Sequence, residues 1–307
     1  MDFELSETQA LVQDALAGMF NDFRSLSPGS YGEYLPAPQL EQLLSEGGFF
    51  DLIGMEGYGP LDAALMVYEA ARLPYLVEVA ASALVAPLLG ETALPRPIAL
   101  ADSRTGAIRH LPGARSLLLL ENGQAHVALL DGVEIEPLSS VLGYPFGKLA
   151  APEQLATRAL GAGAGERLAL WWRVALAVEA AGLMRAALDC TLEYVVQRQQ
   201  FGRAIGSFQA VQHRLATATQ LVNGCRWLAL RAASSGEACE AAVAALYAQD
   251  QMRTIVNDLH QFTGAIGLTQ EYPLHLWTYR LKALQGELGG LPQQALAASG
   301  VWETAAA

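Results

Sequence analysis

The residues of this chain best suited to chemistry lie in a corner between two long apolar segments, at residues 194–213. Arg198, Phe201 and Gln209 occur there among several glycines. The glycines predict a turn, and a new helix is expected to start near Ser207 with that serine as its N-cap. A fixed arginine beside the free N–H groups of a helix start suits an anion such as a pyrophosphate. A plain glycine-rich corner with a solvated arginine is the alternative.

A second unusual corner spans residues 260–273. Gln261 supplies both a donor and an acceptor, and the small residues Gly264 and Ala265 follow it closely. Small residues let the backbone approach a ligand or another chain. The alternative is an ordinary loop, with Thr269 as the N-cap of the next helix.

Metal chemistry is not indicated. The histidines in the C-terminal half lie singly on expected helices, and the three cysteines have no metal-ligand spacing. We expect these cysteines to be reduced residues of a cytoplasmic protein, and the residues concerned are His213, His260, His275, Cys190, Cys225 and Cys239.

The composition limits the class of partner. Of 307 residues, 52% are hydrophobic and only 16% are charged, which favours a large helical core or a subunit interface. The net charge of −12 argues against nucleic acid or an anionic membrane as the partner. No apolar run is long enough to predict membrane insertion, and the acidic start of the chain does not resemble a signal peptide.

The elements that must position the two corners are mostly helices. The pattern predicts helices over residues 5–24, 38–46 and 60–90, the last divided near Pro74. Ser6 and Gln9 form a capping-box pair at the first of them. Residues 95–150 instead show short apolar runs around Asn122-Gly123, which predict a hairpin within a small antiparallel β unit.

The C-terminal half reads as a bundle of about four long helices. The expected helices cover residues 166–200, 207–234, 237–264 and 270–285, and another follows Pro292. Two apolar faces on the first of them predict a helix inside the bundle. The sequence is therefore expected to be mainly α, with an N-terminal helical domain at 1–94, a shortened β domain at 95–160 and a four-helix bundle domain at 161–307.

Both corners resemble signatures of the acyl-CoA dehydrogenase family. Arg198-Gln-Gln-Phe201-Gly, followed by Phe208-Gln209-Ala-Val-Gln-His213, is similar to the central signature, and Gln261-Phe-Thr-Gly264-Ala265 through Pro273 is similar to a later one. The order of an α-helical part, a β part and a four-helix bundle also fits.

The resemblance implies a flavoprotein that takes two hydrogens from an acyl-CoA thioester, with FAD at a subunit interface. Arg198 is then expected to pair with the pyrophosphate, Phe201 to pack on the adenosine half and Gln209 to hydrogen-bond nearby. On the second corner, Gln261, Gly264 and Ala265 are expected to complete this ADP-side pocket.

Several residues depart from the family pattern. No tryptophan lies between positions 91 and 170, where the family has a flavin-contacting stretch. The position of the family's catalytic glutamate falls on Leu288, with Glu287 one residue early, and the alternative base position of some branches falls on Trp172. Glu287 is the candidate base if the loop has a one-residue gap. Glu179 is interpreted as part of a buried ion pair with an arginine of the bundle.

These departures leave three hypotheses. The leading one is a smaller subunit of a heteromeric acyl-CoA dehydrogenase, as found in bacterial steroid side-chain degradation, whose larger partner supplies the flavin-ring contacts and the base. The second is a complete homo-oligomeric enzyme that uses Glu287. The third is a non-catalytic scaffold that has lost FAD.

Overall fold

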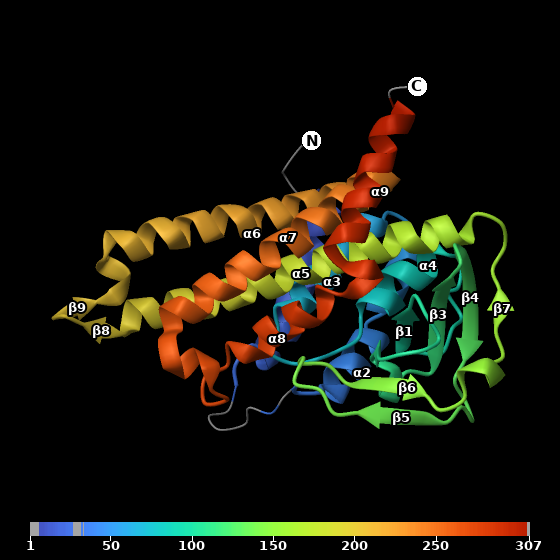
Figure 1. Ribbon diagram of the computed structural model, residues 1–307, viewed down its shortest axis with the longest axis horizontal. Coiled ribbons are helices and arrows are strands. Elements are labelled where there is room, and N and C mark those ends of the chain that lie inside the picture. The colour runs from blue at the N-terminus through green and yellow to red at the C-terminus, as the bar shows by residue number, and fades with distance from the viewer. Residues whose placement is uncertain (1–5, 27–31, 33, 306–307) are drawn as a thin grey trace.

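The computed structural model describes residues 6–26, 32 and 34–305, with side chains to residue 300. Long helices run the length of the molecule, and two small β-sheets lie at one end of them (Figure 1). The N-terminal part is helical, with a π-helical stretch before its last short helix, and consists of α1 (Glu7–Phe20), α2 (Pro38–Glu46), α3 (Pro60–Ala71), the π-helix η3 (Ala80–Val85) and α4 (Ala86–Leu88).

The predicted capping box at the start of α1 is confirmed. The backbone N–H of Gln9 donates to the Ser6 hydroxyl at 3.2 Å, and the Ser6 N–H donates to the Gln9 side chain at 2.9 Å. The predicted interruption near Pro74 is also present, because α3 ends at Ala71 and the next helical turn begins at Ala80.

The β part consists of two sheets that share a small apolar core. One sheet has the order β1-β3-β4-β7 and the other the order β2-β6-β5. The strands are β1 (Ile98–Ala101), β2 (Ile108–Arg109), β3 (Ser116–Glu121), β4 (Gln124–Leu129), β5 (Ile135–Leu138), β6 (Phe146–Leu149) and β7 (Arg158–Ala159).

The β3–β4 pair is the predicted hairpin, and both turn residues have positive φ, +52° at Asn122 and +75° at Gly123. The expectation of a purely antiparallel unit was wrong, since β1 pairs with β3 in parallel. The segment between these two strands returns through β2 in the second sheet, which allows the parallel pairing.

The C-terminal bundle is arranged around α5. This 34-residue helix spans about 51 Å and has buried residues on all sides, as its two apolar faces predicted. It packs against both following long helices, and the bundle helices are α5 (Ala164–Gln197), α6 (Gln209–Ser235), α7 (Ala238–Thr263), α8 (His275–Leu284) and α9 (Gly290–Ala305). A two-stranded hairpin, β8 (Gln199–Gln200) and β9 (Arg203–Ala204), joins α5 to α6 at the end farthest from the sheets (Figure 1).

Two predicted helix starts were wrong. Phe208, and not Ser207, occupies the N-cap position of α6, because the Ser207 hydroxyl donates to the carbonyl of Ala204 at 2.7 Å. Likewise α8 begins at His275, because the Thr269 hydroxyl donates to the Ile266 carbonyl and closes the short helix η7 (Gly264–Leu268). The domain boundaries after residues 94 and 160 stay a prediction.

Candidate functional site

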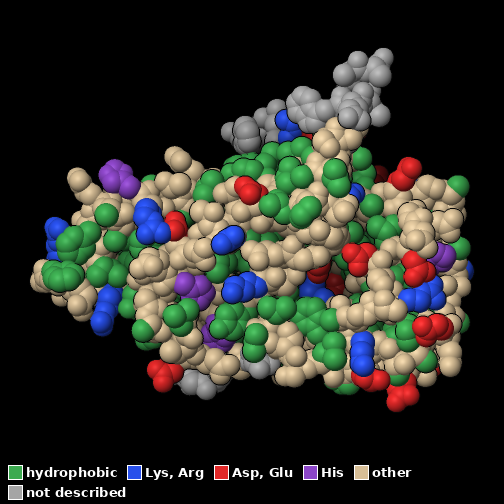
Figure 2. Space-filling model, viewed as in Figure 1, with side chains coloured by type: hydrophobic (Ala, Val, Ile, Leu, Met, Phe, Trp, Pro, Cys, Tyr) green, Lys and Arg blue, Asp and Glu red, His purple; other side chains and the backbone are tan. Residues whose placement is uncertain are grey.

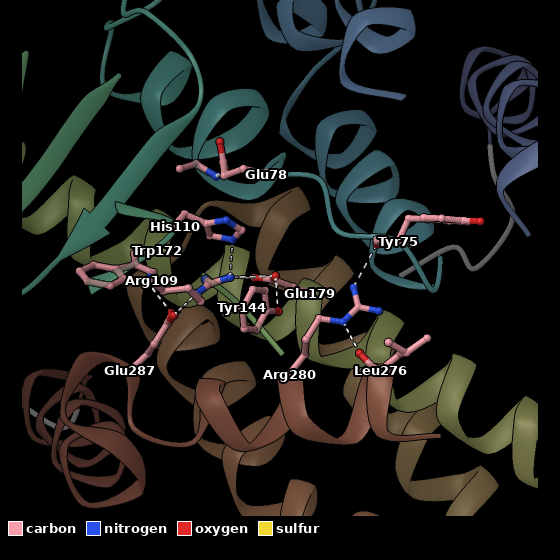
Figure 3. A network of polar contacts seen from close by, with 11 residues as sticks. Tyr75, Glu78, Arg109, His110, Tyr144, Trp172, Glu179, Leu276, Arg280 and Glu287 are labelled. Atoms are coloured by element: carbon pink, nitrogen blue, oxygen red, sulfur yellow. Dashed lines mark hydrogen bonds and ion pairs between the residues drawn. The ribbon is translucent and has the colours of Figure 1, made fainter. Parts of the chain in front are cut away.

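A buried arginine joins the β part to the bundle at the positions where the sequence placed a base. Arg109 on β2 donates from Nε to Glu287 Oε1 at 2.5 Å and from Nη1 to Glu179 Oε1 at 2.9 Å (Figure 3). Trp172 of α5 donates its indole N–H to Glu287 Oε2 at 3.0 Å. The two base positions inferred from sequence therefore lie next to each other, and both carboxylate oxygens of Glu287 accept hydrogen bonds from donors of this chain.

The corner that carries Glu287 is held by two buried side-chain amides. Gln249 of α7 donates to the carbonyls of Leu284 and Glu287, at 2.9 and 3.1 Å. Gln294 of α9 donates to the carbonyl of Leu288 at 3.1 Å, and its own oxygen accepts from Arg173. Leu288 has φ +52°, an unfavourable conformation for a branched residue. Buried amides on three carbonyls compensate for that strain and fix the direction of Glu287.

Tyr144 and Glu78 complete the surroundings of Arg109. The Tyr144 hydroxyl donates to Glu179 Oε1 at 2.8 Å, and the Arg109 guanidinium lies over the Tyr144 ring, 4.6 Å from its centre. Glu78, buried next to this cluster, accepts from the N–H groups of Ala81 and Ile98 and from the Ser82 hydroxyl. Glu78 is thus engaged in holding η3 against β1.

Burial sets the protonation of the cluster. It raises the pKa of Glu287, an effect that the Arg109 charge offsets and the Glu179 charge increases. Burial alone would lower the pKa of Arg109, but Glu179 and Glu287 outweigh it and raise that pKa well above its ordinary value. For His110, burial and then the Arg109 and Arg280 charges lower the pKa well below 6.5. The arginine is therefore a permanent cation and His110 is neutral.

A cavity of about 240 Å³ opens on this cluster. Its walls combine apolar side chains with polar residues of the loop after β1 and with Arg109 and Glu287. The residues that line it include Leu100, Asp102, Ser103, Thr105, Ile108, Leu142, Phe146, Trp172, Ala283 and Leu288.

The first predicted binding corner lies far along the bundle, at the β8–β9 hairpin (Figure 1). Phe201 is 92% exposed and has φ +56°, and its one ring contact among the described residues is an edge-on approach to Phe208. Arg198 makes no ion pair within the described ranges, and the first turn of α6 has no side-chain cap. Gln209 is exposed at that uncapped turn.

The second predicted corner is also exposed. Gln261 lies in the last turn of α7, and Gly264 has φ +63° at the start of η7, followed by Ala265. Both corners lie towards the same end of the bundle, although no hydrogen bond between them exists in the described part of the chain. Space-filling colours show basic and apolar side chains at this end of the molecule (Figure 2).

The prediction for Glu179 was half right. It does form a buried ion pair, but with Arg109 of the β part and not with an arginine of the bundle. Sequence reasoning did not find Arg109, because β2 has only two residues and carries no periodicity. It also did not find Tyr144, which lies in the loop between β5 and β6. Arg280 of α8 donates to the carbonyls of Leu73 and Tyr75.

The comparisons with known proteins agree with this fold. Residues 164–289 match the family model described as acyl-CoA dehydrogenase, C-terminal domain. Two relatives come from Mycobacterium tuberculosis: acyl-CoA dehydrogenase FadE34, 32% identical over 60% of this chain, and acyl-CoA dehydrogenase IpdE2, 34% identical over 43% of it. The aligned parts cover only 26% and 42% of those two proteins.

A solved structure extends the likeness to the whole chain. A chain in the ChsE4-ChsE5 complex from Mycobacterium tuberculosis superposes with a TM-score of 0.76 and 18% identity, covering 98% of both chains. The fold, helical at the start, β in the middle and a bundle at the end, is thus that of the acyl-CoA dehydrogenases. The bundle sequence, residues 164–289, is in addition similar to the C-terminal domain of that family.

None of the helices within the described ranges has the length and apolar character needed to cross a membrane. No group of three or more histidine, cysteine, aspartate or glutamate side chains in that part of the chain is placed to hold a metal ion.

Proposed function

We propose that this chain is a subunit of an acyl-CoA dehydrogenase and contributes the ADP half of an interfacial FAD site to a partner subunit. Arg198, Phe201 and Gln209 on the first corner, with Gln261, Gly264 and Ala265 on the second, hold that half. FAD, when bound, accepts the two hydrogens removed from the α and β carbons of an acyl-CoA thioester. The partner is a larger acyl-CoA dehydrogenase chain that carries the flavin-ring contacts and the base.

One observation carries the proposal: the chain holds Phe201 in an unfavourable backbone conformation and leaves the ring in water. A left-handed conformation costs a non-glycine residue about 1–2 kcal/mol, and an exposed phenyl ring gains nothing from burial. Both costs are offset once a ligand and a partner cover the corner.

The residues of the corner fit an adenine dinucleotide. The uncapped first turn of α6 presents N–H groups to an anion, and Arg198 is a cation without a partner among the described residues. Phe201 offers a flat apolar surface for stacking. The match of residues 164–289 to the C-terminal domain of the acyl-CoA dehydrogenases supports the same cofactor, because both corners lie within that range.

Glu287 is a structural ion-pair residue in this proposal. A general base needs a carboxylate oxygen that is free to accept the substrate proton. Glu287 Oε1 accepts from Arg109 and Oε2 from Trp172. The partner's base would then perform the proton abstraction. That a heteromeric complex contains a chain of the same fold supports this division of work.

The test is co-expression with a longer family member that has an intact base, followed by the flavin absorbance of the purified complex. We expect flavin bands from the pair, little flavin from this chain alone, and at least about tenfold weaker flavin retention with Arg198→Met, since one charge-assisted contact is lost.

The matched control is Arg203→Met. Arg203 is exposed on the same hairpin, but its guanidinium lies over the Phe208 ring, 4.0 Å from the centre. Equal flavin retention by Arg198→Met and Arg203→Met would contradict the proposal that Arg198 holds the ADP half of FAD. Absence of flavin bands from the pair would favour a scaffold that has lost FAD.

A second function is favoured by the contact between Trp172 and Glu287. This contact places a carboxylate where both sequence counts located a base. In a complete homo-oligomeric acyl-CoA dehydrogenase, substrate binding would displace Arg109 and free Glu287. Full acyl-CoA dehydrogenation by the chain alone would establish this alternative.

A further inference from the structure

The helices α6 and α7 lie side by side and are joined by an ion pair near each end (Figure 1). Near the turn between them, Arg231 of α6 donates from Nε to Glu240 of α7 at 2.7 Å. Towards the opposite end, Arg214 of α6 forms an ion pair with Asp258 of α7. The very short linker between α6 and α7 already fixes their spacing at the first end. At the second end, non-covalent contacts have to hold the two helices together.

The ion pair at this second end lies beside both corners of the proposed ADP site. Arg214 comes early in α6, the helix that begins at Gln209, and Asp258 comes just before the second corner. The Arg214 guanidinium also lies over the ring of Phe262, 5.0 Å from its centre, and Phe262 directly follows Gln261. One arginine side chain thus connects the helix that carries Gln209 with the segment that carries Gln261.

Tyr272 connects the second corner with the end of α5. Its hydroxyl donates to the carbonyl of Cys190 at 2.8 Å, and its ring meets the ring of Tyr194 edge-on, with 5.5 Å between the ring centres. The carbonyl of Tyr194 in turn accepts from the N–H of Arg198 at 2.8 Å. Tyr272 therefore packs against the last turn of α5, from which Arg198 projects.

The exposure of the ion pair argues against a main role in the stability of the fold. The Arg214 side chain is 48% exposed and the Asp258 side chain 21% exposed, and ion pairs near the surface contribute little to the free energy of unfolding. A binding site built from two separate corners instead requires that their spacing is fixed before the ligand arrives, because ordering them on binding would cost affinity. The pair lies where it can fix that spacing.

We propose that Arg214, Asp258 and Tyr272 are positioning residues that hold the two corners at the spacing that the ADP half of FAD requires. This inference rests on the function proposed above and adds three residues to it. They act through the residues of the two corners, by holding α5, α6 and α7 in register at this end of the bundle.

The first test measures the dissociation constant of FAD from the deflavinated complex of this chain with the longer family member. We expect Asp258→Asn to weaken FAD binding by about three- to fivefold, which corresponds to the upper range for an exposed ion pair. Glu240→Gln is the matched control, because it makes the same change in the other ion pair between α6 and α7, and it should bind FAD as the wild type does.

A charge swap distinguishes positioning from a general structural role. Arg214→Asp alone places two carboxylates opposite each other and should weaken FAD binding, whereas Arg214→Asp combined with Asp258→Arg restores opposite charges and should recover part of the affinity. Tyr272→Phe, which removes only the hydroxyl, should weaken FAD binding by about two- to threefold.

Hydrogen exchange tests the positioning in the chain alone, without flavin. The amides of residues 264–268 should exchange faster in Asp258→Asn than in Glu240→Gln, while the two variants unfold in urea at the same concentration.

The outcomes separate this inference from the proposed function. If Asp258→Asn binds FAD as tightly as Glu240→Gln while Arg198→Met still binds it weakly, the positioning role is overturned and the proposed ADP site stands. If the swapped double variant recovers no affinity, or if Asp258→Asn unfolds at a clearly lower urea concentration, the pair has only a structural role and the inference is overturned. A wild-type complex that binds no FAD would overturn the proposed function and this inference together.

Discussion

Two arginines of this chain illustrate opposite uses of the same side chain. Arg109 is buried, and two carboxylates and a histidine ring take up its Nε and Nη1. Arg198 is exposed at the far end of the bundle and has no carboxylate partner among the described residues. The first fastens the β part to the helices, whereas the second is available to a ligand that the chain does not supply.

The backbone shows the same contrast. Leu288 and Phe201 both have φ between +50° and +60°, at +52° and +56°. Leu288 is buried, and Gln249 and Gln294 bond the carbonyls around it. Phe201 is 92% exposed and lacks such support. The backbone strain at Leu288 is thus compensated by contacts within the chain, whereas the strain at Phe201 has no such compensation among the described residues.

The largest effect should follow from Arg109→Met. Two buried carboxylates would lose their cation, and breaking such a pair from one side costs about 3–5 kcal/mol in the free energy of unfolding. Arg198→Met should change this free energy by less than about 0.5 kcal/mol. Urea unfolding of the two variants measures both free energies. Similar losses would show that Arg109 and Arg198 contribute equally to the stability of this chain, which contradicts the contrast between them.

Gln294→Leu should destabilise the chain by about 2–4 kcal/mol. It leaves the carbonyl of Leu288 and the Nε of Arg173 without partners, each at a cost of about 1–3 kcal/mol. Gln293→Leu, the exposed neighbour on the same helix, is the control and should be almost neutral. Thermal unfolding compares them, and a neutral Gln294→Leu would show that the buried amide does not hold this corner.

His110 should make stability depend on pH. Its pKa is lowered in the folded chain, so the unfolded chain binds more protons below pH 6.5 and stability falls as the pH drops through that value. Between about pH 7 and 5.5 the loss should be about 1 kcal/mol greater than in His110→Gln, which lacks the titrating ring. Urea unfolding at both pH values measures this loss. An equal loss of unfolding free energy in the wild type and in His110→Gln would contradict the prediction.

Phe201→Gly should have effects of opposite sign on two measurements. Glycine adopts positive φ without strain, so the isolated chain should become more stable by up to about 1 kcal/mol. Flavin retention in the assembled complex should weaken, because the stacking surface is gone. A destabilised isolated chain would show that Phe201 serves the fold of this chain and not a ligand.

The main helices and the β-hairpin could be predicted from the sequence, because helical periodicity, capping residues and turn residues are local signals. The apolar faces of α5, the capping box at Ser6 and the hairpin at Asn122-Gly123 were all visible in the pattern. Helix starts were less visible, since Ser207 and Thr269 each had another carbonyl to bond.

The buried ion-pair cluster could be predicted only in part. Glu287 and Trp172 were found by position, but Arg109 lies 70 residues before Glu179 and 178 before Glu287. Its strand is two residues long, too short to show an alternating pattern. Contacts of this kind depend on how the β part docks on the bundle, which a single sequence does not encode in any local pattern.

The most direct test of the division of work is Glu287→Gln in the assembled complex, with flavin bleaching by an acyl-CoA substrate as the measurement. Because the base belongs to the partner in this account, the variant should retain flavin and bleach at the wild-type rate. Arg198→Met in the same complex should lose flavin. A Glu287→Gln complex that keeps its flavin but no longer bleaches would show that this chain carries the base, and would contradict the account.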